Sequence, residues 1–182
     1  MRSRIELTLH LLEAGFGVMA DNLKNLTLAE ALFAPPNCYR SILGTVKHTA
    51  GWSHVYRSYA FEAAPTHWRD LPWPGELRDT IVKSDAYLAE VIGWLDLSNQ
   101  LWQQDLRRTQ EEELDQPRPV HWGSTMPLFD IVRLIAHHTV YHAGEVNQLL
   151  AICRQESWEE GEEVEENNIP SAGHRVVPPW KR

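Results

Sequence analysis

The chain has 182 residues, a formal net charge of −8 and 43% hydrophobic residues. This length is enough for one domain with a sizeable core. The negative charge argues against binding to nucleic acid or to an anionic membrane surface. No run of about 18 apolar residues occurs, so we expect no membrane span. Two cysteines make no disulfide framework, and we therefore expect a reduced, cytoplasmic location.

Two amphipathic helices are predicted in the first third of the chain. Apolar residues recur three and four positions apart over residues 5–26, which predicts the first helix, and a proline pair prevents its continuation. The second helix is expected over residues 38–62 with Asn37 as its cap. The inward stripe of this second helix is apolar and aromatic except for His48.

The middle of the chain gives a weaker pattern. A third helix is predicted to start near Pro74 and to end near residues 96–99, where Ser98 would cap a short further turn. After it, prolines and a glycine interrupt any helix. We expect a short strand at residues 120–122, paired with residues 106–109 as a hairpin before the last helix.

The last helix is predicted over residues 125–155, and an acidic tail over residues 156–182. Four helical segments in one chain predict an all-α four-helix bundle, with residues 1–155 as its single domain. Eight tryptophans are many for this length; most are expected to pack in the core, and a minority to line a ligand pocket.

The apolar seam of the last helix carries three polar residues. Its positions are Leu128, Ile131, Ile135, His138, His142, Glu145, Leu149 and Ile152. Imidazoles in a core stripe need partners for their nitrogens, and two of them at positions i and i+4 can bind one metal ion. The seam therefore predicts a metal site inside the bundle.

His48 is the best candidate for a third ligand, because it interrupts a core stripe in the same way. Three protein ligands with open positions are typical of a catalytic metal site, whereas a structural zinc site has four ligands. His137 points elsewhere on its helix, and His54 is expected at the surface. His121 and the remaining histidines are weaker candidates, although the loop of His121 must cross the end of the bundle.

Glu145 is the candidate catalytic residue. It could orient a ligand imidazole or accept a proton, or it could be a partly exposed carboxylate near the bundle end. Tyr59 and Tyr141 could hold a substrate oxygen, although tyrosines in such positions more often serve packing. The sequence has no His-Glu-x-x-His motif, no Glu-x-x-His pair, no phosphate-binding loop and no Gly-x-Ser-x-Gly elbow.

The segment 134–149 resembles the last-helix motif of the DinB-like (YfiT-like) proteins. That motif reads His, three residues, His, any residue, Gly, then Gln or Glu; here it is matched by His138, His142, Gly144 and Glu145. These proteins also have a histidine early in the second helix, which His48 matches. The resemblance covers roughly residues 3–155 and leaves the tail outside.

The resemblance implies an up-and-down bundle with an unusual helix order and a divalent metal, usually zinc or nickel, on three histidines. It also implies a homodimer. Characterised relatives include S-transferases that use low-molecular-weight thiols such as bacillithiol or mycothiol, and a mycothiol-dependent maleylpyruvate isomerase. One position departs from the pattern: relatives often have a basic residue where this chain has Ala143, so a role for that charge cannot be transferred.

Three hypotheses follow. In the first, a metal on His48, His138 and His142 serves an enzyme that acts on a small-molecule substrate, either by binding a thiol as thiolate for S-transfer or by activating water for hydrolysis. In the second, the chain is a non-catalytic metal-binding or interaction protein, with a fourth protein ligand or no pocket. In the third, the bundle is metal-free and its histidines satisfy one another.

Overall fold

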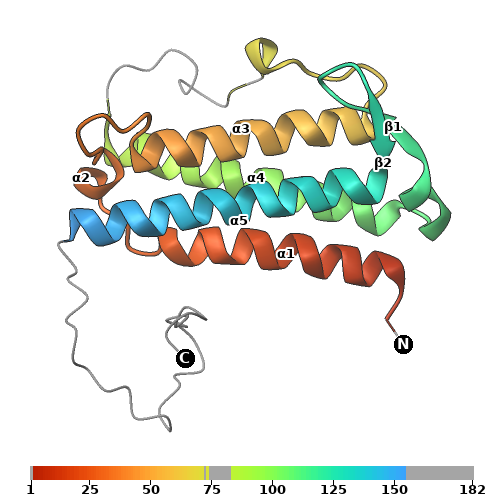
Figure 1. Ribbon diagram of the computed structural model, residues 1–182, viewed down its shortest axis with the longest axis horizontal. Coiled ribbons are helices and arrows are strands. Elements are labelled where there is room, and N and C mark those ends of the chain that lie inside the picture. Colours follow the sequence, from red (N-terminus) through yellow and green to blue (C-terminus); the bar gives the residue numbers. More distant parts are fainter. Residues whose placement is uncertain (1, 72, 74–82, 155–182) are drawn as a thin grey trace, which may run out of the picture.

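The computed structural model describes residues 2–71, 73 and 83–154 and shows long helices packed side by side (Figure 1). In chain order the elements are α1 (Arg4–Leu23), α2 (Leu28–Ala31), α3 (Ile42–Phe61), a 3₁₀ turn (Trp68–Asp70), α4 (Asp85–Arg108), a second 3₁₀ segment (Glu111–Asp115), β1 (Pro117–Pro119), β2 (Thr125–Pro127) and α5 (Leu128–Cys153). The predicted all-α bundle is confirmed. The predicted acidic tail and the predicted helix start near Pro74 lie outside the described residues.

Serine caps begin three of the four long helices. The hydroxyl oxygens of Ser3, Ser41 and Ser84 each accept a hydrogen bond from the backbone N–H three residues later, at 3.1, 3.1 and 3.2 Å. Each bond satisfies one of the backbone donors that a helix start leaves without a partner. Local sequence therefore determines where α1, α3 and α4 begin.

Two helices start later than the sequence predicts. Asn37 does not cap α3; it adopts a left-handed conformation with φ 65° in the preceding turn, and the helix begins at Ile42. Asparagine tolerates this conformation better than most residues, which explains its use in the turn. Similarly, α5 begins at Leu128 rather than at Thr125, because Thr125 belongs to β2.

The predicted end of the third helix at residues 96–99 is wrong, because α4 continues without a break to Arg108. Ser98 is buried inside the helix, and its hydroxyl donates a hydrogen bond to the Oγ of Ser53 at 2.8 Å. One turn further on, Trp102 is fully buried. Tertiary burial of this face outweighs the weak helix propensity of the local sequence.

A short hairpin does precede the last helix, but its strands differ from the predicted ones. β1 pairs with β2 in antiparallel register, and residues 106–109 belong to the end of α4 and its cap instead. The predicted strand 120–122 lies in the connection between the two strands. Val120 is buried as a strand residue would be, yet its N–H bonds to the carbonyl of Ser124 at 3.0 Å and closes the loop.

α3 and α4 run in the same direction. The Nζ of Lys47, near the start of α3, lies 3.4 Å from the hydroxyl oxygen of Tyr87, near the start of α4. At the other end, the ring of Phe61 packs edge-on against Trp102, with ring centroids 5.6 Å apart. The two helices are therefore parallel neighbours, with their starts at one end of the bundle and their ends at the other.

α1 and α5 are also parallel, and they approach each other closely. A Cβ on Gly15 would lie 2.9 Å from the carbonyl oxygen of Ala136, so this contact requires a glycine. One and a half to two turns further along both helices, the side chain of Asn22 donates to the carbonyl of Ala143 at 2.7 Å. The helices thus run as two parallel pairs, α1 with α5 and α3 with α4.

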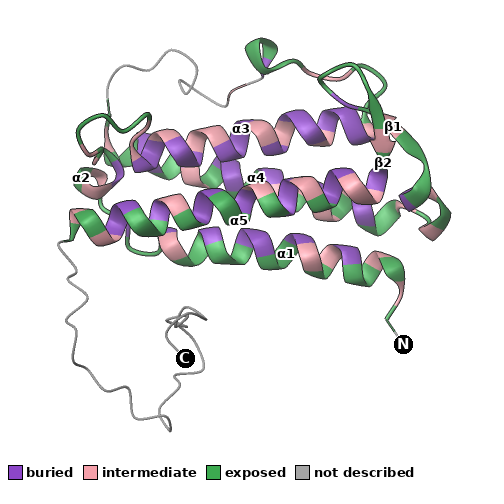
Figure 2. Cartoon of the chain, viewed as in Figure 1, coloured by how far each residue is buried: buried purple, intermediate pink, exposed green. Residues whose placement is uncertain are grey.

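The buried residues lie on the inward faces of all four long helices (Figure 2). The largest fully buried side chains include Trp102, Leu12, Met19, Ile131 and Ile135. α5 packs between α1 and α3, so one stripe of α5 faces α3. Among the described residues, none of the helices combines the length and the apolar character needed to span a bilayer.

Candidate metal centre

Three imidazoles meet between α3 and α5. His48 comes from the second turn of α3, and His138 and His142 come from adjacent turns of α5. The ring centroid of His48 lies 5.3 Å from that of His138 and 4.8 Å from that of His142. One nitrogen from each ring can be chosen so that all three lie within 4.8 Å of one another. Within the described residues, His48, His138 and His142 therefore form a group that could hold a metal ion.

The two histidines of α5 face each other through their Nε2 atoms, which are 3.0 Å apart. Two nitrogen ligands at roughly 2.0–2.1 Å from one tetrahedral ion lie about 3.3 Å apart. The observed separation is therefore close to the spacing that a shared ion needs. Without an ion, one of these nitrogens must carry a proton and donate it to the other.

Glu145 lies one turn beyond His142 and holds that ring in place. Its Oε2 is 2.7 Å from the Nδ1 of His142. A carboxylate at Nδ1 places the proton there, so that the lone pair of Nε2 faces the other two rings. The Glu145 carboxylate also raises the pKa of the Tyr141 hydroxyl. These contacts favour an orienting role for Glu145 over that of an exposed carboxylate.

Burial favours the neutral form of His48 and His138. Removal from water, followed by the positive charge of Arg40 and the neighbouring ring of His142, lowers the pKa of His48 to about 4. Burial and the neighbouring rings likewise lower the pKa of His138 to about 3. Both side chains therefore present lone pairs at neutral pH, as metal ligands must.

The three rings do not satisfy one another completely. The Nδ1 of His138 is buried and has no hydrogen-bond partner among the described residues. Buried polar atoms in folded proteins nearly always have a partner, so this cluster is costly as a purely structural element. The donor set, its spacing and its neutral state fit a divalent cation.

Two tryptophans cover the outer side of His48. The rings of Trp52 and Trp68 stack with centroids 5.0 Å apart, and that of Trp68 lies 5.9 Å from His48. Trp68 can approach α3 because residue 51 is glycine; a Cβ there would lie 2.5 Å from the Trp68 ring. These two tryptophans lie beside the histidine cluster, whereas the lining of the adjoining pocket contains no tryptophan among the described residues.

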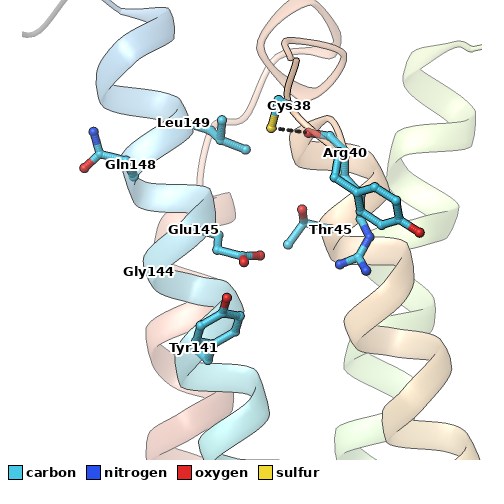
Figure 3. A pocket seen from close by; sticks show the side chains of 9 residues that line it. Cys38, Arg40, Thr45, Tyr141, Gly144, Glu145, Gln148 and Leu149 are labelled. Atoms are coloured by element: carbon cyan, nitrogen blue, oxygen red, sulfur yellow. Dashed lines mark hydrogen bonds between the residues drawn. The ribbon is translucent and has the colours of Figure 1, made fainter. Parts of the chain in front are cut away.

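A pocket of roughly 490 Å³ opens beside the imidazoles, between the start of α3 and the second half of α5 (Figure 3). It is lined by Cys38, Tyr39, Arg40, Thr45, Tyr141, Gly144, Glu145, Gln148 and Leu149. The histidines themselves do not line it. Glu145 and Tyr141 connect the two, since Glu145 bonds His142 and the Tyr141 ring lies 5.0 Å from that of His142.

The other histidines lie outside the cluster. His137 is exposed on α5, as predicted. His54 was expected at the surface but is partly buried, because its ring stacks on Trp94 of α4 at a centroid distance of 5.8 Å. His121 packs against Trp52 at 4.7 Å from the hairpin connection. Tyr59 is buried in the core, and its hydroxyl lies 3.2 Å from the Nδ1 of His67. Both observations indicate a structural role for Tyr59.

Sequence reasoning missed most of the pocket. Gln148 could have been found, because positions 141, 145 and 148 share one face of α5. Arg40 and its two predecessors were predicted to belong to the second helix, but the structure places them in the irregular segment before α3, which begins at Ile42. Only the packing of that segment against α5 brings these side chains to the pocket.

Comparison with known proteins agrees with this architecture. The fold and the site place this chain among the all-α bundles that have a candidate metal site. In this chain the site consists of three imidazoles beside a pocket. The sequence profile of the DinB superfamily matches residues 11–146, and the chain belongs to this superfamily.

One solved structure has the same fold over most of its length. The crystal structure of the conserved protein of locus from Enterococcus faecalis superimposes with a TM-score of 0.60 at 19% identity, covering 85% of this chain and 99% of that one. At this identity the likeness concerns the fold alone. A comparison with curated proteins gave no match.

Proposed function

We propose that this protein is a metal-dependent enzyme in which His48, His138 and His142 hold a divalent cation, zinc or nickel. The observation that carries the proposal is the convergence of three imidazoles, with ligand atoms within 4.8 Å of one another, beside a pocket. Such a cation, when bound, lowers the pKa of a thiol or a water molecule at its open position.

We propose thiol-dependent S-transfer as the reaction, with hydrolysis by water as the alternative chemistry at the same site. In S-transfer, the thiol gives its proton to a base, its sulfur forms a bond to an electrophilic carbon, and the leaving group departs with its bonding electron pair. Glu145 would keep the His142 ring oriented throughout. The pocket is large enough for a small-molecule substrate or a low-molecular-weight thiol.

Two features support catalysis over a purely structural role. Within the described residues, the cluster contains three possible protein ligands rather than the four of a typical structural zinc site. In addition, the pocket lies next to the cluster and shares Glu145 with it. A structural metal site needs no adjoining space for a second molecule.

The test begins with metal content, measured by mass spectrometry on protein purified without a histidine tag. About one zinc or nickel ion per chain is expected. The loaded and the chelator-stripped protein are then compared for consumption of small thiols in the presence of 1-chloro-2,4-dinitrobenzene and, separately, for ester hydrolysis. Activity that depends on the ion supports an enzyme. A bound ion with no turnover of any kind favours a non-catalytic metal-binding protein, and absence of any bound ion contradicts the metal site itself.

The homodimer remains a proposal from the family resemblance. Sedimentation velocity at micromolar protein concentration is the measurement that decides it.

A further inference from the structure

The pocket carries opposite charges on its two walls. Arg40, which directly precedes the cap of α3, and Glu145 of α5 both line the cavity of roughly 490 Å³. Figure 3 shows the Glu145 carboxylate directed from α5 toward the wall that Arg40 and Thr45 form. The cavity therefore has a cationic side and an anionic side.

The charge of Arg40 is not neutralised by a carboxylate of the described residues, although other arginines of the chain are paired; Arg57, for example, lies 2.6 Å from Asp105. The guanidinium carbon of Arg40 lies 4.8 Å from the centroid of the Tyr39 ring. This contact holds the side chain in place and leaves its charge available to a molecule that enters the pocket.

The Glu145 carboxylate also keeps capacity for a ligand. Its Oε2 lies 2.7 Å from the Nδ1 of His142, and its side chain is 37% exposed. The two oxygens of a carboxylate can accept about four hydrogen bonds, so a donor in the cavity can bind Glu145 without displacing His142.

The remaining lining includes apolar surface, from Leu149 and from the rings of Tyr39 and Tyr141. A cavity of this volume that combines apolar walls with a few polar groups is typical of a site for a small organic molecule. A ligand with a single charge would be attracted by one wall and repelled by the other, whereas a ligand with both charges is complementary to both.

We infer that the pocket binds a small zwitterion of the amino-acid class, with its carboxylate on Arg40, its ammonium group on Glu145 and its apolar part against Leu149. Guanidinium groups pair with carboxylates through two parallel hydrogen bonds, and ammonium groups donate to carboxylates. The histidines do not line the pocket, so this binding requires no metal and goes beyond the proposed function.

The test is calorimetric titration of the full chain with two zwitterions and their singly charged counterparts. L-Phenylalanine is compared with 3-phenylpropionate and 2-phenylethylamine, and 6-aminohexanoate with hexanoate and hexylamine. The first set carries both charges on one carbon, and the second carries them at opposite ends of a chain. At least one zwitterion should bind about tenfold or more tightly than each of its counterparts, the size expected for a charge-assisted hydrogen bond.

Two variants should each abolish a different preference, which a general disturbance of the pocket would not do. In Arg40→Gln the zwitterion should bind no more tightly than the amine, and Arg40→Lys should restore part of the difference. In Glu145→Gln the zwitterion should bind no more tightly than the carboxylic acid. If Glu145→Gln does not fold, the probes on the wild type and on Arg40→Gln decide the matter.

The matched controls are Arg133→Gln and Asp130→Asn, which remove the two charges of an ion pair of 3.1 Å on α5 outside the pocket. Both should keep the wild-type preferences. The inference is overturned if neither zwitterion binds at millimolar concentration, if a singly charged counterpart binds as tightly as its zwitterion, or if Arg40→Gln keeps the wild-type preferences.

The titrations are made on the protein as purified and again after removal of metal by a chelator. The preferences should be the same in both, and a preference seen only with metal would place the zwitterion on the ion and overturn the inference. Absence of any bound ion would contradict the proposed function and leave this inference standing, so the two failures are distinguishable.

Discussion

Two regions of the bundle contain buried polar side chains, and they differ in whether all of these side chains have hydrogen-bond partners. In the serine–tryptophan region, formed by Ser53, Ser98 and Trp102, every buried polar side chain has a protein partner: Ser98 donates to Ser53, and the indole N–H of Trp102 donates to the carbonyl of Ser53 at 3.0 Å. In the histidine region, formed by His48, His138 and His142, one buried nitrogen has none among the described residues.

The difference indicates what each region is for. A buried polar group whose hydrogen bonds are all made within the protein adds specificity to helix packing and needs no ligand. A cluster of imidazoles whose nitrogens are only partly hydrogen-bonded, and that adjoins a pocket, is better explained by an ion and a second molecule. The following predictions test this contrast, from the largest expected effect to the smallest.

Replacing a histidine ligand should have the largest effect. His138→Ala removes one of three ligands, and we expect at least about a 100-fold weaker affinity for zinc, because even partners of the ligands contribute tenfold to 100-fold. Competition with a chromophoric chelator measures it. The control His137→Ala removes the adjacent, exposed imidazole and should bind zinc as the wild type does. Equal affinity of both variants would refute the histidine region as the metal site.

Trp102→Ala should instead destabilise the fold and spare the metal site. Removal of a fully buried tryptophan costs about 3–5 kcal/mol of unfolding free energy, as measured by urea denaturation. Trp122→Ala is the control, since that side chain is half exposed on the hairpin connection and should cost less than about 1 kcal/mol. If the folded fraction of Trp102→Ala also lost zinc, the two regions could not be treated as independent.

Glu145→Gln should weaken metal binding without unfolding the chain. The amide cannot carry the negative charge that stabilises the His142 ring, so the affinity for zinc should fall about 10- to 100-fold. Urea unfolding of the metal-free variant should match that of the wild type. Asp130→Asn changes the same charge near the start of α5 and should leave the affinity unaltered. An unchanged affinity in Glu145→Gln would assign Glu145 to the pocket alone.

The smallest effect is the pH dependence of the metal-free protein. His48 and His138 have pKa values lowered to about 4 and about 3, whereas unfolded histidine has a pKa near 6.5. The unfolded chain therefore binds more protons below pH 6.5. Stability from these groups is present above that pH and decreases as the pH falls toward 4 and then 3.

Between pH 7 and pH 6 the loss should be less than about 1 kcal/mol per histidine. Chemical denaturation across this range measures it. His48→Gln should show a shallower pH dependence, whereas His10→Gln, which replaces an exposed imidazole, should not change it. A steeper dependence in His48→Gln would contradict a neutral, buried His48.

Local signals in the sequence were enough for the helical class and for half of the site. The spacing of apolar residues along α1 and α5 depends only on helix geometry, and so does the placement of His138, His142 and Glu145 on one face. The hydrogen bond between His142 and Glu145 follows from their separation of three residues. No knowledge of the neighbouring helices is needed for any of these.

Tertiary structure decided the rest. α4 continues past residues 96–99 because Ser98 and Trp102 pack against α3, a contact that local propensity does not contain. His48 was a candidate by its own stripe, but only the antiparallel packing of α3 on α5 brings its ring to the other two.

Arg40 shows the limit of local reasoning most clearly. It was expected inside the second helix but precedes the start of α3, and its pocket neighbours on α5 are about 100 residues away in the chain. The physical reason is general: helix spacing is set by backbone hydrogen bonds between near neighbours, whereas a pocket is formed by side chains that only long-range packing brings together.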